Sequence, residues 1–349
     1  MGRYRQWAWN EPVEGPQSET LAMKLIIQIP CLNEEETLPE TLADLPREVE
    51  GFDEVEWLII NDGSTDRTVE IAKQHGVDHV VSHVVNRGLA AGFLSGLDAA
   101  IKAGADVIVN TDADNQYNAQ DIPALTAPIL EGSADMVIGA RPIAETEHFS
   151  PIKKFLQKFG SGVVRIASGT DVADAPSGFR AMSRDAAMQF NVFNPYTYTL
   201  ETIIQAGQKH IHVVNVPIRT NGPTRPSRLV KSIRAYVTRS MGTILRISML
   251  YRAKMFFTCL SLLPLGLGLL LYARWVLLYF IEDEYRSRVP SLVVGTVCLL
   301  IGVQLLVFGW LADLLAANRR IVEDCQLRLR RLEADHFTEQ IESQDKPTA

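Results

Sequence analysis

The chain has 349 residues, which is enough for one domain of ordinary size and an accessory region. Its net charge is −7, so the composition of the whole chain gives no argument for nucleic-acid binding. The four cysteines lie far apart and match neither a disulfide framework nor a zinc site, which favours a reducing, cytoplasmic setting.

Residues 1–22 show no periodicity and lack the continuous apolar core of a signal peptide, so we interpret them as an N-terminal extension. From residue 23 to residue 227, short apolar segments alternate with helix-like segments. This alternation predicts an α/β domain with a largely parallel sheet covered on both faces. Strands are expected at 24–30, 56–60, 79–85, 106–110, 135–140 and 211–219, and helices at 34–45, 66–75, 88–103, 119–130, 152–167 and 199–208.

Polar residues stand at the ends of several of these predicted strands. In an open parallel sheet, ligands bind beyond the carboxyl ends of the strands. The shared placement therefore predicts a ligand site built from residues of separate segments, namely Asn33, Asp62, Asn86, Asp112 and Arg141.

Asp112 and Asp114 directly follow the buried strand predicted at 106–110. Two carboxylates at this spacing offer hard oxygen ligands, which suit Mg²⁺ or Mn²⁺ held partly by substrate phosphates. A solvated acidic turn is the alternative for this motif taken alone. The preceding α/β domain and the apolar stretches that follow favour a membrane enzyme that uses a metal-bound nucleotide-sugar.

The segment 228–254 is basic, with seven Lys or Arg residues and no acidic residue. Its apolar residues recur at helical spacing, which predicts an amphipathic helix beside anionic headgroups at the membrane interface. A helix packed on the preceding domain is the alternative.

Two uncharged apolar runs, Met255–Ala273 and Val289–Ala312, are 19 and 24 residues long. A membrane span requires about 20 such residues, so we assign spans to 255–281 and 289–317. Basic residues precede the first span and follow the second, which predicts a cell-membrane protein with the α/β domain and both termini in the cytoplasm. Residues 318–349 are expected to form a cytoplasmic helix and tail. An apolar stripe in that helix predicts a packing or homo-oligomer contact through Ile321, Cys325, Leu329 and Leu332.

Six short motifs occur in order along the chain. They are Pro-Cys-Leu-Asn-Glu at 30–34, Asn-Asp-Gly-Ser-Thr-Asp at 61–66, Asn-Arg-Gly at 86–88, Asp-Ala-Asp-Asn-Gln at 112–116, Gly-Ala-Arg at 139–141 and Ser-Gly-Phe-Arg at 177–180. Together they resemble the family 2 glycosyltransferases of the GT-A fold. The similarity covers residues 24–317 and is greatest to the polyprenyl-phosphate branch, which includes dolichyl-phosphate mannose synthase and GtrB-type enzymes.

The resemblance implies an inverting, metal-dependent hexosyltransferase that uses Mg²⁺ or Mn²⁺. It would transfer a sugar from a nucleotide-diphosphate sugar to polyprenyl phosphate at the cytoplasmic membrane face. The GtrB-like number of spans favours a UDP-sugar, and a GDP-mannose-dependent enzyme is the alternative.

Three other classes fit the sequence less well. A processive polysaccharide synthase usually carries a Gln-x-x-Arg-Trp motif and more spans. A dinucleotide-dependent oxidoreductase requires a Gly-x-Gly-x-x-Gly motif after the first strand, where this chain has Pro-Cys-Leu-Asn-Glu. A nonenzymatic scaffold would not need Asp112 and Asp114.

By the same similarity, the metal would be positioned by Asp112, Asp114 and Gln116. The nucleotide-sugar would be bound by Pro30, Leu32, Asn33, Glu34, Asp62, Asn86, Arg87, Gly88, Asp112, Ala113 and Asp114. Many family members have Tyr at the position of Leu32, so ring stacking at that position is lost.

The acceptor phosphate oxygen is already anionic at neutral pH, so no general base is required, and cations must instead bring two phosphates together. Guanidinium groups grip phosphate oxygens in pairs. We therefore expect catalysis to involve Asp114, Arg141, Arg180, Arg225 and Arg228. Weaker candidates for an acceptor contact are Lys158, Ser161 and Glu201.

Overall fold

The structure is a computed structural model of the whole chain. It describes residues 22–142, 161–162, 164–165, 168–192, 198–221, 242, 249, 253–281 and 289–344. Most of the predicted interfacial segment 228–254 and most of the helix predicted at 152–167 lie outside these residues.

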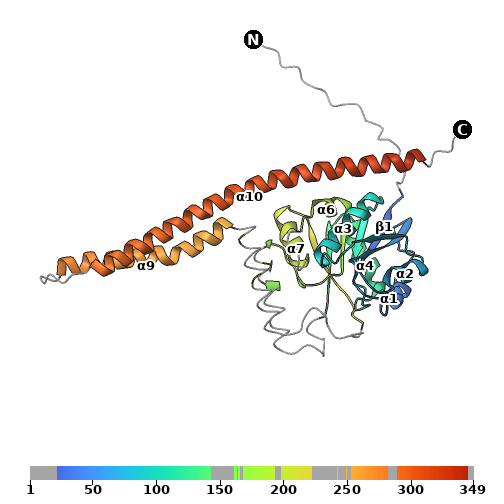
Figure 1. Cartoon of the computed structure of the whole chain (residues 1–349), viewed down its shortest axis with the longest axis horizontal. Coiled ribbons are helices and arrows are strands. Elements are labelled where there is room, and N and C mark those ends of the chain that lie inside the picture. Colours follow the sequence, from blue (N-terminus) through green and yellow to red (C-terminus); the bar gives the residue numbers. More distant parts are fainter. Residues whose placement is uncertain are drawn as a thin grey trace, which may run out of the picture.

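A seven-stranded sheet forms the centre of the N-terminal domain (Figure 1). Its strands are ordered β3-β2-β1-β4-β6-β5-β7, and every neighbouring pair is parallel except those that include β6. The strands are β1 (Lys24–Cys31), β2 (Glu54–Asn61), β3 (His79–Ser82), β4 (Val107–Asn110), β5 (Met136–Ala140), β6 (Arg180–Ser183) and β7 (Val213–Pro217).

Helices cover both faces of the sheet because alternate strand residues are apolar on both sides. On one face lie α1 (Leu38–Asp44), α2 (Thr68–Gln74) and α4 (Ile122–Leu130). The other face is covered by α3 (Leu89–Lys102), α6 (Arg184–Gln189) and α7 (Thr199–Gln208).

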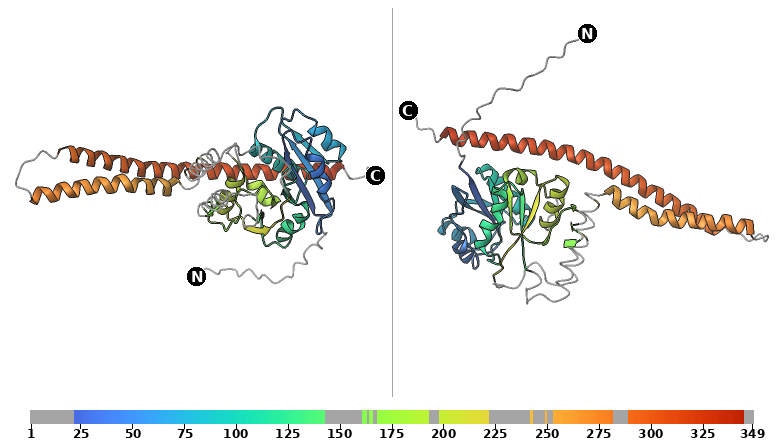
Figure 2. Two further views of the ribbon diagram at one scale, coloured as in Figure 1. Left: turned by 90° about the horizontal axis from the view of Figure 1, so that it is seen from below. Right: turned by 180° about the vertical axis from the view of Figure 1, so that it is seen from behind.

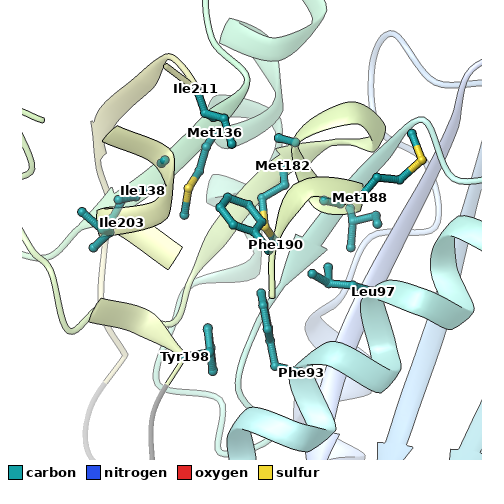
Figure 3. Close-up of a cluster of buried hydrophobic side chains, with 14 of the residues drawn as sticks. Phe93, Leu97, Met136, Ile138, Met182, Met188, Phe190, Tyr198, Ile203 and Ile211 are labelled. Atoms are coloured by element: carbon teal, nitrogen blue, oxygen red, sulfur yellow. The ribbon is translucent and has the colours of Figure 1, made fainter. Parts of the chain in front are cut away.

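Aromatic side chains join the helices of the second face (Figure 3). Phe93 of α3 stacks on Tyr198, with ring centroids 3.9 Å apart, and both side chains are buried. Figure 3 shows Phe190 among three methionines: Met136 and Met182, which belong to the sheet, and Met188. This packing fixes the start of α7 against α3.

The mainly parallel sheet confirms the predicted α/β architecture, with two local corrections. The first helix begins at Leu38 rather than at 34, because Asn33 has a positive φ of 54° and residues 34–37 form a turn. The antiparallel strand β6 was not predicted. Its register places Arg180 beside Asn110, at the carboxyl end of β4.

Two long apolar helices follow the domain. They are α9 (Ala253–Ile281) and α10 (Val289–Gln344), which lie side by side as a hairpin that extends away from the sheet (Figure 2). Within them, Ala253–Phe280 and Val289–Glu333 are long and apolar enough to cross a membrane, and few of their residues are buried. These helices suggest a membrane protein. Pro264 lies inside α9 and does not end it.

The helix α10 runs through the predicted boundary at 317/318 and includes the second span and the helix expected after it. It continues without a break along α3 and α6 of the domain (Figure 1). Residues at seven-residue spacing form the face of α10 that lies against the rest of the chain. That face contains Gly295, Gly302 and Gly309, which contact α9, and then Ala316, Glu323 and Arg330.

Polar contacts fix the later part of this face to the domain. Glu323 is buried and pairs with Lys209 at 3.1 Å, and Arg330 donates hydrogen bonds to the carbonyls of Met188 and Phe190. The predicted apolar stripe through Ile321 and Leu332 is instead exposed. It therefore does not pack on its own domain.

Candidate active site

The carboxyl ends of β1, β2 and β4 lie side by side at one edge of the sheet. Cys31 is opposite Asn61 in the β1–β2 pair, and Gln28 is opposite Asn110 in the β1–β4 pair. Because β6 runs antiparallel, its first residue, Arg180, lies at the same edge. The structure therefore brings the motifs at 30–34, 61–66, 112–116 and 177–180 to one edge.

Asp112 and Asp114 occupy the loop directly after β4, and both are half-buried. Burial and the neighbouring Asp114 carboxylate raise the pKa of Asp112 to about 7. Asp114 accepts a hydrogen bond from the Gln116 side chain at 2.8 Å. Gln116 thus orients Asp114 here. The hydroxyl of Thr41 in α1 fixes the loop by donating to the carbonyl of Ala113 at 2.9 Å.

Gly178 approaches this loop closely. A Cβ atom there would lie 3.1 Å from the Tyr198 hydroxyl and 3.2 Å from Asp112 Oδ1. The Gly178 amide donates to the Tyr117 hydroxyl at 3.0 Å. The Ser-Gly-Phe-Arg motif therefore lies against Asp112.

Asn110 connects the buried groups beneath the acidic loop. It accepts a hydrogen bond from Gln28 and donates to the Gly178 carbonyl and the Tyr198 hydroxyl, all at 2.9 Å. Asn110 and the side chains of Gln28 and Tyr198 are all buried, so these groups have no access to water. The amide thereby fixes the end of β4 relative to β1 and β6.

Replacing Asn110 with alanine should lower the free energy of unfolding by about 1–3 kcal/mol, because it leaves buried hydrogen-bonding groups without partners. Urea unfolding of the full chain in detergent, followed by tryptophan fluorescence, measures this loss. The exposed Gln120→Ala serves as the control. A change within about 0.5 kcal/mol, as is usual for surface substitutions, would contradict the role of Asn110.

Arg141 follows β5 and forms a bidentate pair with the buried carboxylate of Asp174, at 2.7 Å and 3.0 Å. Burial alone would lower the pKa of Arg141, but the hydrogen bonds to Asp174 raise it above its usual value. Its guanidinium also acts on the charge of Asp112. Arg141 is therefore a fixed positive charge at the site edge.

Arg180 is fully buried, and its guanidinium donates to the carbonyls of Ser177, Ala175 and Thr199 and to the Thr202 hydroxyl. Burial lowers the pKa of Arg180 to about 10, which leaves it charged at neutral pH. From the sequence, we expected this arginine to bind phosphate. In this structure its donors instead hold the loop before β6 against α7, while its charge lies near Asp112.

Asp62 follows β2 and organises the Asn-Arg-Gly motif. Its carboxylate accepts hydrogen bonds from the backbone amides of Arg87 and Gly88, both at 2.8 Å, and contacts His83 Nδ1 at 2.7 Å. The Asn86 side chain also accepts a bond from the Gly88 amide. Asp62 is buried, so its primary contacts here are with the protein itself.

The motif at 30–34 packs against the motif at 61–66. The Asn33 amide donates to the Ser64 hydroxyl, and the Thr65 amide donates to the Asn33 side chain. Glu34 is buried and accepts a bond from the Thr37 hydroxyl. Pro30 is the penultimate residue of β1 and is paired with Ile60, and Leu32 is the first residue after the strand. These residues form the wall of the site beyond β1 and β2.

The acceptor candidates fall into two groups. Ser161 and Glu201 are buried, so Glu201 is not the helix-surface residue that α7 alone suggests. Ser161 accepts a bond from the Ala175 amide at 3.3 Å. Lys158, Arg225 and Arg228 lie outside the described residues.

The chain just before Arg225 is nevertheless fixed beside the acidic loop. The Asn221 amide donates to the Gln116 carbonyl at 2.9 Å, and its side chain donates to the Asn115 carbonyl at 2.9 Å. Arg225 follows Asn221 by four residues, a stretch that can span at most about 14 Å.

Four residues of the site were not predicted from the sequence: Asn110, Tyr117, Asp174 and Tyr198. A polar residue inside an otherwise apolar strand was the available signal for Asn110. Tyr198 and Asp174 reach the site only through β6 and α7, and no local pattern marks them.

The sequence model described as Glycosyl transferase family 2 matches residues 26–190. An uncharacterized glycosyltransferase of Mycobacterium bovis is 31% identical over 58% of this chain and 88% of its own length. A UDP-N-acetylglucosamine–dolichyl-phosphate N-acetylglucosaminyltransferase of Methanococcus voltae is 29% identical over 57% of this chain and 87% of its own length. An undecaprenyl-phosphate mannosyltransferase of Micrococcus luteus is 28% identical, with corresponding shares of 56% and 83%.

Among solved structures, glucosyl-3-phosphoglycerate synthase from Mycobacterium tuberculosis, in complex with Mn²⁺, UDP and phosphoglyceric acid, matches with a TM-score of 0.51. It is 18% identical, and the match covers 65% of this chain and 78% of that chain. This likeness confirms the predicted GT-A type of fold. The family model and the Mycobacterium bovis relative show that the chain belongs to glycosyltransferase family 2.

Proposed function

We propose that this glycosyltransferase transfers a sugar, with inversion, from a nucleotide-diphosphate sugar to polyprenyl phosphate at the cytoplasmic face of the membrane. One observation carries the proposal. The Asp112–Asp114 loop lies against Asn221, from which the chain leads through Arg225 and Arg228 to two apolar helices. A site for a metal-bound diphosphate and a site for a membrane phosphate would thus adjoin.

The names of two relatives support the acceptor class, since one acts on dolichyl phosphate and the other on undecaprenyl phosphate. A UDP-sugar is the favoured donor, in keeping with the relative that uses UDP-N-acetylglucosamine. GDP-mannose is the second candidate, because another relative is a mannosyltransferase.

The residues at the acidic loop fit a divalent cation. Asp112 is a carboxyl group whose charge is disfavoured by burial and by Asp114, and a cation between them would relieve that cost. The described residues contain no group of three or more His, Cys, Asp or Glu side chains able to hold a metal. Two carboxylates suit an ion whose other ligands are donor phosphates and water. When bound, Mg²⁺ or Mn²⁺ would supply charge stabilisation for the departing diphosphate.

The affinity for Mn²⁺ should depend on pH in a specific direction. Because the pKa of Asp112 is about 7, a proton must leave before a cation binds below that pH. Affinity should therefore rise by up to about tenfold per pH unit below pH 7 and level off above it. Calorimetric titration with Mn²⁺ and UDP measures this slope, and Asp112→Asn should flatten it. A slope that persists in this variant would exclude Asp112 as its origin.

The acceptor oxygen is anionic, so the reaction needs no general base. Fixed positive charges are instead needed to bring the donor and acceptor phosphates together. Arg141 is held by Asp174 at the site edge. Arg225 and Arg228 would hold the acceptor phosphate, and either could also contact the donor diphosphate. Pro30, Glu34 and Asp62 would line the nucleotide side, with Asp62 shaping the loop at 86–88.

Both termini and the catalytic domain should lie on the cytoplasmic side, since basic residues flank the two spans and a short connector joins them. Cysteine labelling in sealed vesicles measures this orientation. In a chain whose four native cysteines are replaced by serine, a cysteine introduced by Asp335→Cys should react only from the cytoplasmic face. A cysteine introduced by Ser287→Cys should react only from the opposite face. The reverse pattern would overturn the orientation, and release by carbonate would exclude spanning helices.

The function is tested by incubating the purified chain with undecaprenyl or dolichyl phosphate and a panel of UDP- and GDP-sugars. Mass spectrometry of the lipid should show one hexose or acetamidohexose joined through phosphate. A polymer of sugars would favour a processive synthase instead. Turnover to a soluble acceptor, with none to lipid phosphate, would refute the acceptor class.

A further inference from the structure

The helix α10 carries an exposed seam that continues past the membrane-spanning part. The seam consists of residues spaced alternately by four and three positions: Leu311, Leu315, Asn318, Val322, Cys325, Leu329 and Leu332. Leu315 and Leu332 are 68% and 67% exposed, and the other apolar members are exposed too. This spacing is the heptad pattern of coiled coils.

The seam lies on the side of α10 that faces away from its own domain. Internal contacts of α10 use Ala316, Glu323 and Arg330, each one position after a seam residue and about 100° around the helix. The mid-line of the seam therefore lies about 130° around the helix from these contact residues. A partner helix could cover the seam without displacing the catalytic domain.

Two side-chain amides favour contact between this seam and the same seam of a second copy of the chain. Asn318 lies in the seam, and Gln304 stands two heptads before it in the same frame, inside the apolar span. Both are exposed, and among the described residues neither side chain has a hydrogen-bond partner. Within the span an unpaired Gln304 amide is unfavourable, and at both positions one amide can donate to and accept from an identical amide.

The membrane limits how two copies can meet. Every copy inserts α10 in the same direction, so two such helices can pair only in parallel. In a parallel symmetric pair each seam residue meets its own counterpart, which places the two amide layers in register. Arg328 and Glu333 flank the seam at the heptad positions that form ion pairs between helices. In the dimer, Arg328 of one copy would lie near Glu333 of the other.

We propose that the seam of α10 binds the same seam of a second copy, which makes the protein a parallel homodimer. The inference rests on the two spans of the proposed function, but on neither the donor nor the acceptor. The exposed apolar seam residues that follow the span, Val322, Cys325, Leu329 and Leu332, are then covered in the dimer.

Cysteine cross-linking in native membranes tests the pairing. In a chain with Cys259→Ser and Cys298→Ser, the remaining exposed cysteine described by the structure is Cys325, in the seam. Copper phenanthroline should convert most of this chain to a disulfide-linked species of twice the monomer mass. The matched control adds Cys325→Ser and Asp324→Cys, which moves the thiol one position out of the seam, and its cross-linking should fall at least tenfold.

A second variant checks association without cysteine chemistry. Leu329→Glu/Leu332→Glu should convert the dimer to a monomer in mild detergent, as measured by light scattering, whereas Asp324→Ala should leave it dimeric. Unchanged thermal unfolding would show that the domain remains folded. Equal cross-linking at positions 324 and 325, none at 325, a monomeric parent chain, or a cross-link to another protein would each overturn the proposal. Sugar transfer is not the readout, so failure here is separable from failure of the proposed function.

Discussion

Replacing Asp114 with alanine should reduce sugar transfer by roughly 10³-fold while the fold stays intact. A divalent cation contributes several kcal/mol by stabilising the charge of the leaving diphosphate, and each 1.36 kcal/mol corresponds to about tenfold in rate. Asp114 is half-buried, and its carboxylate accepts a hydrogen bond from the Gln116 side chain in the same loop. Its removal therefore affects the site far more than the core.

Initial rates at saturating donor and acceptor measure the loss, and circular dichroism checks the fold. Asp98→Ala is the matched control, because Asp98 is a carboxylate on α3 paired with Lys102. Wild-type activity should also disappear in excess chelator and return with Mn²⁺. Undiminished transfer in chelator, or near-normal rates for Asp114→Ala, would exclude a metal at this loop.

The double variant Arg225→Ala/Arg228→Ala should weaken the use of lipid phosphate by one to two orders of magnitude. A charge-assisted hydrogen bond contributes about 1.5–3 kcal/mol, and both guanidiniums are expected to serve the acceptor phosphate. The Asn221–Gln116 contact fixes the start of their segment beside the acidic loop. The loss should therefore appear mainly as a higher KM for the lipid.

Two measurements separate this role from a structural one. Binding of the nucleotide should change much less than the KM for polyprenyl phosphate. Replacement of both residues by lysine should restore part of the activity, since the charge returns without the bidentate geometry. Lys73→Ala, on exposed α2, is the control for loss of a surface cation. A normal KM for polyprenyl phosphate in the double alanine variant would contradict this role and would show that the segment only links the domain to the spans.

Much of the fold follows from the sequence because its periodicities are local. The runs at 24–30 and 56–60 are apolar enough to identify buried strands, and β1 and β2 contain them. Placement of Asp62 and Asp112 at strand ends then follows from parallel topology alone. The uninterrupted apolar runs likewise predict the helices α9 and α10.

The rest depends on contacts between distant segments. Strand β6 is four residues long, and it pairs with both β4 and β5, which no local pattern reveals. For that reason Arg180 looks like a free cation in the sequence, whereas the structure buries it under α7. The continuity of α10 was also missed, because its composition changes from apolar to charged while its helical geometry does not.

Because α10 is continuous, the number of residues between the bilayer and the catalytic domain fixes the direction in which the domain faces around the helix axis. Each residue added between the apolar span and Glu323 would rotate the domain by about 100° around the helix axis and move it about 1.5 Å along it. One insertion would thus carry the acidic loop to another side of the helix, although every catalytic group remained present. Seven insertions would nearly restore the direction but move the domain about 10 Å farther along the helix. Natural length variation in this segment should accordingly be rare, and insertions or deletions should come as whole heptads.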